Sequence, residues 1–66
     1  MKITLNGKEK ELSQSLDLKS LVEQLCRDSG RVIAEVNGQI VKPPQWIDTS
    51  LKDGDTIELV NFVGGG

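Results

Sequence analysis

The sequence contains no histidine, no tyrosine and a single cysteine, Cys26, in 66 residues. Without histidine, the chain lacks the commonest general base and the commonest metal ligand of proteins. A lone cysteine forms neither a disulfide framework nor a thiolate metal cluster. These absences indicate a protein with little catalytic machinery of its own and no resident metal.

The sequence also lacks an excess of positive charge and any long apolar run. The formal net charge is −2, which provides no basic surface for nucleic acid or anionic lipid. No segment approaches the roughly 20 apolar residues of a membrane helix, and the N-terminus has no apolar signal-peptide core. We therefore expect a cytoplasmic protein that binds neither nucleic acid nor membranes.

The remaining residues suffice for one small domain with a thin core, because a chain of this size buries only about 60% of its unfolded surface. The apolar share is 36%, and the only aromatic residues are Trp46 and Phe62. We expect residues 1–63 to form this domain and the glycines of residues 64–66 to form a flexible tail.

The N-terminal sequence predicts a β-hairpin. Residues 2–5 alternate polar and apolar side chains, the period of a half-buried strand. Asn6-Gly7 favours a type I′ turn, because both residue types tolerate a positive φ. The return strand, residues 8–12, is strongly charged and suits an exposed edge, so its Glu9 and Glu11 are interpreted as solvated.

A change of period then predicts a helix over residues 18–28. Apolar side chains recur at helical spacing at Leu18, Leu21, Val22 and Leu25. Asp17 suits the N-cap, and Gly30 suits the left-handed position just past the end. Cys26 falls at the border of the apolar stripe, so we interpret it as a small core residue and not as a reactive thiol.

The second half of the sequence predicts three further strands, over residues 31–36, 39–41 and 56–63. Asn37-Gly38 marks another hairpin turn, and Pro43-Pro44 ends the middle strand because proline donates no ladder hydrogen bond.

Residues 45–51 predict a compact loop with a helical turn. Its expected anchors are Trp46, Ile47 and Leu51. We interpret Trp46 as a plug at one end of the core and not as an exposed binding residue. Asp53 and Asp55 flank a glycine, and turn formation explains them better than a metal loop, which needs further ligands.

The element order β-β-α-β-β-β predicts an α+β fold, a mixed sheet with one helix packed on one face. The apolar last strand suits a central position, parallel to the first strand. If Ile57 and Leu59 face the helix, then Val60 and Phe62 face the open side. Because apolar residues exposed together usually mark a docking site, we predict that Val60 and Phe62 contact a partner.

The chain closes on Gly64, Gly65 and Gly66. Fraying explains a terminal glycine run, but a second explanation is chemical. The α-carboxylate of Gly66 is ionised at neutral pH and must be activated before anything is attached to it. Glycines carry no Cβ, so Gly64 and Gly65 suit a chain end that threads into the narrow active site of an activating enzyme.

Four stretches together resemble a known family: the opening MKITLNGK, the central VNGQIV, the turn LKDGD and the ending FVGGG. Over its whole length the chain is similar to the β-grasp, ubiquitin-like sulfur carriers. Within that group it is most similar to the thiamin-biosynthesis sulfur carriers of the ThiS type.

This resemblance implies a cycle on the chain end. An adenylating enzyme would use ATP and Mg²⁺ to convert the Gly66 carboxylate to an acyl-adenylate. Sulfur from a cysteine persulfide on a donor protein would displace AMP and leave a thiocarboxylate, which thiazole synthase would accept as its sulfur source. Gly65 and Gly66 would be the conjugation residues, with Gly64 lengthening the run. The chain would then be a carrier, a protein co-substrate and not an enzyme, and would bind no cofactor itself.

Two alternatives stay open from the sequence. A carrier for molybdopterin synthesis shares the fold and the tail, although its tail typically reads differently and its chain is usually longer. A non-covalent interaction module would have the same domain with a chemically inert tail.

Overall fold

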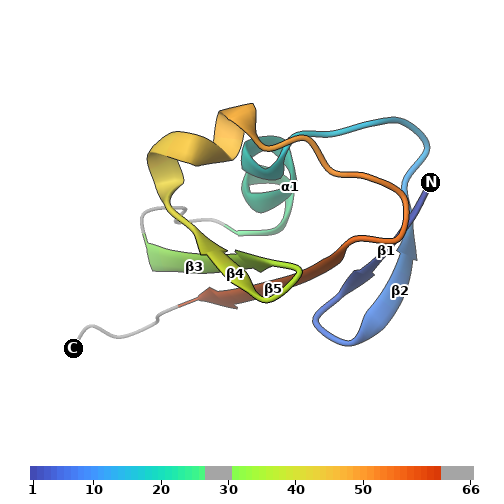
Figure 1. The fold of residues 1–66 in the computed structure, drawn as a ribbon, viewed down its shortest axis with the longest axis horizontal. Coiled ribbons are helices and arrows are strands. Elements are labelled where there is room, and N and C mark those ends of the chain that lie inside the picture. The colour runs from blue at the N-terminus through green and yellow to red at the C-terminus, as the bar shows by residue number, and fades with distance from the viewer. Residues whose placement is uncertain (27–30, 62–66) are drawn as a thin grey trace.

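The computed structural model describes residues 1–26 and 31–61. They form a five-stranded sheet in the order β2-β1-β5-β3-β4, with the helix α1 and the 3-10 helix η2 on the same side of it (Figure 1). The elements are β1 (Lys2–Leu5), β2 (Lys8–Glu11), α1 (Leu18–Leu25), β3 (Val32–Val36), β4 (Gln39–Val41), η2 (Pro43–Asp48) and β5 (Thr56–Asn61). The predicted α+β fold and element order are confirmed.

The central strand is β5, as predicted. It pairs in parallel with β1, where Leu5 lies opposite Ile57. It pairs antiparallel with β3 over five positions, from Val32 opposite Asn61 to Val36 opposite Ile57. The edges of the sheet are the charged strand β2 and the three-residue strand β4, and both are short, which limits pairing with other chains.

Both hairpins turn on an Asn-Gly pair with positive φ at both residues. The φ angles are 50° at Asn6 and 83° at Gly7, then 52° at Asn37 and 85° at Gly38. These left-handed conformations match the right-handed twist of the flanking strands, and only Gly, Asn and Asp adopt them at low cost. The predicted type I′ turn at Asn6-Gly7 and the predicted hairpin turn at Asn37-Gly38 are therefore confirmed.

The two asparagines also tie their hairpins to β5. Asn6 Oδ1 accepts a hydrogen bond from the Leu59 amide at 2.8 Å. Asn37 Oδ1 accepts one from the Thr56 amide at 2.9 Å, and its Nδ2 donates to Asp55 Oδ1 at 3.0 Å. Each turn therefore fixes both its own hairpin and the position of the central strand.

Replacing Asn37 separates these two roles. We expect Asn37→Gly, which keeps the freedom to adopt positive φ but loses both side-chain hydrogen bonds, to lower the free energy of unfolding by about 1 kcal/mol. Asn37→Ala also places a Cβ in the left-handed region, so we expect a loss of about 2 kcal/mol. Urea denaturation measures both. Equal losses in the two variants would contradict the backbone contribution, and a neutral glycine variant would contradict the hydrogen-bond contribution.

Helix α1 begins as predicted and ends early. Asp17 Oδ1 accepts a hydrogen bond from the Ser20 amide at 2.7 Å, which confirms the N-cap. The predicted continuation to residue 28 is wrong, because Cys26 has an extended backbone with φ −124° and ψ 133°. Leu25 is 46% exposed, so the apolar stripe gains little burial in its last turn, and a short helix depends on such packing. The expected C-terminal position, Gly30, lies outside the described residues.

The core fills the space between the sheet and the two helices. Its buried members are Ile3, Leu12, Leu18, Leu21, Val22, Val32, Ala34, Trp46, Leu51 and Ile57. Trp46 is 3% exposed and its Nε1 donates to the Val41 carbonyl at 2.8 Å, which confirms its predicted role as a core plug. The predicted anchoring by Ile47 is wrong. In a 3-10 helix side chains align every third residue, so when Trp46 points inward its neighbour points away, and Ile47 is 57% exposed.

Candidate functional site

The face of the sheet opposite α1 and η2 carries the exposed apolar residues of the strands. Val60 lies between the core-side residue Leu59 and Asn61 in β5 and is 52% exposed, so its predicted position on the open face is confirmed. Phe62, predicted for the same face, lies outside the described residues.

Two isoleucines extend this surface. Ile33 lies directly opposite Val60 in the β3–β5 pairing and alternates with the buried residues Val32 and Ala34. Ile40 is 65% exposed and pairs with Glu35, two positions from Ile33, so it is the diagonal neighbour of Ile33 on the same face. We name Ile33, Ile40 and Val60 the apolar patch. The sequence indicated Val60 through strand alternation, but Ile33 and Ile40 join it only through the strand register.

The apolar patch lies close to the start of the C-terminal segment. Val60 precedes the last described residue, Asn61, in the central strand. The predicted threading residues Gly64 and Gly65 and the predicted reacting residue Gly66 lie outside the described residues. Because a residue spans at most about 3.6 Å, the Gly66 carboxylate stays within roughly 18 Å of the end of β5.

The carboxylates singled out in the sequence have structural partners. Asp55 Oδ2 accepts from the Lys52 amide at 2.8 Å within the turn, as predicted, whereas Asp53 Oδ1 accepts from the Lys2 amide at 2.7 Å and ties the turn to β1. Glu9 and Glu11 are exposed on the edge strand, where Glu11 pairs with the N-terminal amine at 3.4 Å. Within residues 1–26 and 31–61, no group of three or more potential metal ligands is brought together.

Cys26 is half-buried and packs against the core as predicted, although it follows the end of α1 and does not lie on the helical stripe. This contact with the core makes Cys26 a packing residue. We expect Cys26→Ala to lower the melting temperature slightly and to leave the chemistry of the chain end intact. A thermal melt checks the first part, and mass analysis of the C-terminus after the sulfur transfer that the resemblance implies checks the second. Loss of loading in a folded Cys26→Ala chain would assign the thiol a chemical role.

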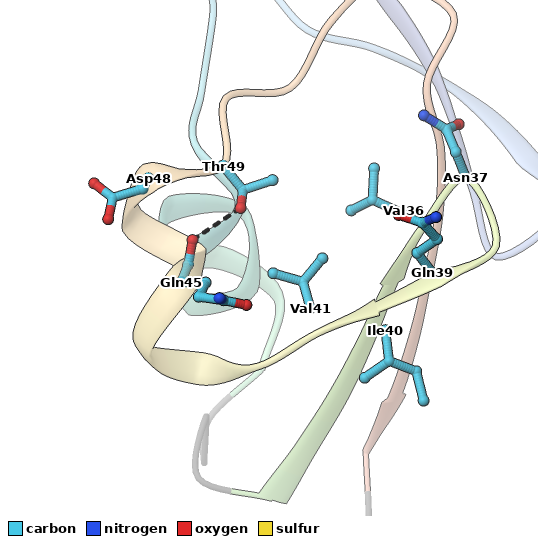
Figure 2. Close-up of a pocket in the computed structure, with 8 residues that line it drawn as sticks. All are labelled: Val36, Asn37, Gln39, Ile40, Val41, Gln45, Asp48 and Thr49. Carbon is cyan, nitrogen blue, oxygen red and sulfur yellow. Dashed lines mark hydrogen bonds between the residues drawn. The ribbon is translucent and has the colours of Figure 1, made fainter.

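An open concavity lies between β4 and η2, on the helix side of the sheet (Figure 2). Val36 and Val41 point into it, and Ile40 points away, toward the other face. Its remaining lining residues are Asn37, Gln39, Gln45, Asp48 and Thr49. Thr49 already donates to the Gln45 carbonyl at 2.8 Å, and Asp48 is the only ionisable side chain of the lining. This set holds no acid–base pair, so the open face and the adjoining chain end remain the candidate site.

No helix within the described ranges is long and apolar enough to cross a bilayer.

Comparison with known proteins gives consistent matches over the full chain. The family model described as "ThiS family" matches residues 3–66. The sulfur carrier protein ThiS of Escherichia coli is 30% identical over 66 residues, which cover all of both chains. The crystal structure of a thiamine biosynthesis protein (ThiS) from Geobacter metallireducens superposes with a TM-score of 0.85, at 33% identity and full coverage of both chains.

A third relative is longer. The thiazole synthase of Paramagnetospirillum magneticum is 38% identical over 66 residues, which are all of this chain and 20% of that protein. The chain therefore spans one fifth of the length of that relative.

Proposed function

The chain belongs to the ThiS family, the sulfur carriers of thiamin biosynthesis, and on this premise we propose that the Gly66 carboxylate is the group that carries the sulfur. The observation that supports this most is that the family match runs through the terminal glycines, to residue 66. Gly66 is the only residue of the tail with a chemical group other than the peptide bond. In this proposal, residues 1–63 act as the folded carrier domain and residues 64–66 as its presenting tail.

The proposed reaction begins with activation by a partner. A carboxylate oxygen of Gly66 attacks the α-phosphorus of ATP on an adenylating enzyme, and pyrophosphate leaves as the acyl-adenylate forms. ATP and Mg²⁺ belong to that enzyme, so the carrier binds no cofactor. A persulfide sulfur of a donor protein then attacks the acyl carbon and AMP leaves. A thiol cleaves the remaining sulfur–sulfur bond, which forms a disulfide and leaves the thiocarboxylate on Gly66.

In this reaction the chain presents the reacting carboxylate, and its partner enzymes provide the general acids and bases. It contains no histidine, and Cys26 packs against the core. Glycines at positions 64 and 65 let the chain end enter a narrow channel, because no Cβ meets the channel wall. We therefore infer that the protein is a co-substrate and not an enzyme.

We also propose that thiazole synthase receives the sulfur. A protein named thiazole synthase contains a segment similar to the whole of this chain, which supports a close functional relation between carrier and synthase. We propose that these steps take place in the cytoplasm and involve protein partners only, with no role for nucleic acid or membrane.

Deletion of the gene tests the proposal. We expect a strain that needs thiamin for growth and recovers when the thiazole moiety is supplied, while its molybdenum-dependent enzymes stay active. Loss of those enzymes without a thiamin requirement would favour the molybdopterin alternative. Growth without either defect would favour the alternative of a non-covalent interaction module.

A further inference from the structure

We propose that the apolar patch and the neighbouring pair Glu35 and Glu58 form one docking surface, which fits an apolar partner surface that places an arginine or lysine between the two carboxylates. This inference deepens the proposed function and rests on it, because the partner in question is the enzyme that adenylates Gly66.

The two glutamates lie directly opposite each other on adjacent strands. Glu35 in β3 is the register partner of Glu58 in β5. Both alternate with core-side residues, Glu35 with Ala34 and Glu58 with Ile57, so both face the open side. Side chains at directly opposed positions lie about 4.5–5.5 Å apart at Cβ, and like charges placed there destabilise a sheet.

Within residues 1–26 and 31–61, neither Glu35 nor Glu58 takes part in an ion pair. The Met1 amine forms an ion pair with Glu11 at 3.4 Å, at the β2 edge of the sheet and away from Glu35 and Glu58. Elsewhere on the open face the structure pairs opposite charges, as in Lys2 opposite Glu11. Glu35 and Glu58 are thus two adjacent carboxylates, on β3 and β5 in the middle of the open face, with no ion-pair partner among the described residues.

The acidic pair and the apolar patch are contiguous. Val60 follows Glu58 by two residues in β5, and its partner Ile33 precedes Glu35 by two residues in β3. Ile40 lies beside Glu35 in the β3–β4 pairing. A partner that covers the patch must therefore also cover Glu35, which is already half-buried.

This contiguity defines the chemistry of the partner. Removing two adjacent carboxylates from water is unfavourable unless a cation accompanies them. A guanidinium suits the position best, because its planar fork donates to two carboxylates at once. An acidic or wholly apolar surface would be rejected, as would an anionic membrane.

The surface is also within reach of the chain end. Gly66 follows Val60 by six residues, so its carboxylate lies at most about 22 Å from the patch. A partner seated on the patch and the acidic pair therefore meets the carboxylate in the same encounter.

A charge-neutral double variant tests this surface against a matched control. Glu35→Gln with Glu58→Gln removes the pair while keeping its size. Glu23→Gln with Asp48→Asn removes the same charge from exposed positions on α1 and η2, on the other side of the sheet. Each chain is titrated, without ATP, against the adenylating enzyme encoded in the same genome, at low and high salt. We expect the first double variant to bind about tenfold more weakly with a flatter salt dependence, and the control to change less than about twofold.

Thermal melts give an independent signature. Because Glu35→Gln with Glu58→Gln removes a repulsion, its melting temperature should stay level or rise while its affinity falls. Unchanged affinity, or an equal loss in the control, would overturn the proposed surface, and so would failure of the unaltered chain to bind.

Absence of ATP–pyrophosphate exchange with an unaltered chain that does bind would contradict the proposed function instead. The titrations would still decide whether the docking surface is correct.

Discussion

A chain amidated at Gly66 will support no ATP–pyrophosphate exchange with the adenylating enzyme, whereas the unaltered chain will support it fully. Amidation replaces the anionic oxygen that attacks ATP with a neutral amide, so the first step of the proposed reaction has no nucleophile. The change adds no bulk and touches none of the core residues, so the melting temperature should stay constant. Normal exchange with the amidated chain would show that the tail is a frayed end.

Chain extension tests the position of the same carboxylate. One residue after Gly66 moves the carboxylate about 3.5 Å along the channel, and a displacement on this scale can lower a rate on the order of 10²-fold. We expect an added alanine to impair exchange more than an added glycine, because alanine also introduces a Cβ. Gly65→Val should be impaired for the same steric reason. Equal exchange by all three chains and the unaltered one would contradict threading.

A carboxylate in the middle of the apolar patch should be the most damaging change on the folded domain. In Val60→Asp the new charge lies beside Ile33 and two residues from Glu58. Burying it against a partner without a counter-ion should weaken binding on the order of 10²-fold. Because Val60 is 52% exposed, the fold should survive with a loss of at most about 1 kcal/mol.

Ile47→Asp is the matched control for this change. Ile47 has a similar exposure, 57%, but lies on η2 at the helix side of the sheet. A binding titration and a thermal melt of both variants separate loss of docking from loss of fold. Equal affinities for Val60→Asp and Ile47→Asp would contradict docking on the open face. Phe62→Ala stays a prediction of weaker binding on the same grounds.

Most elements of the fold could be predicted from short stretches of the sequence. The Asn-Gly turns, the Asp17 cap and the strand alternation each depend on a few neighbouring residues, and the structure confirms all three. The predictions were wrong at two residues whose burial depends on packing against distant parts of the domain. Leu25 has the spacing of a core residue, yet it is 46% exposed and the helix ends there. Ile47 is apolar but sits beside Trp46 on a 3-10 turn, which directs only one of the two inward.

The candidate site was predictable in part for the same reason. Alternation along one strand is enough to place Val60 on the open face. The opposition of Ile33 to Val60, and of Glu35 to Glu58, depends on which residues pair across β3 and β5. Register between strands that are distant in sequence depends on the whole core, so no single stretch of the sequence contains it.

The mass of the C-terminal residue after sulfur loading tests the central claim most directly. The unaltered chain is incubated with the adenylating enzyme, ATP, Mg²⁺ and a persulfide donor, and its C-terminal peptide is then analysed by mass spectrometry. We predict that one oxygen of the Gly66 carboxylate is replaced by sulfur, only when ATP is present, and that Cys26→Ala is loaded equally well. A C-terminal peptide of unchanged mass, or sulfur found at Cys26 instead of Gly66, would contradict a carrier that works through its terminal glycine.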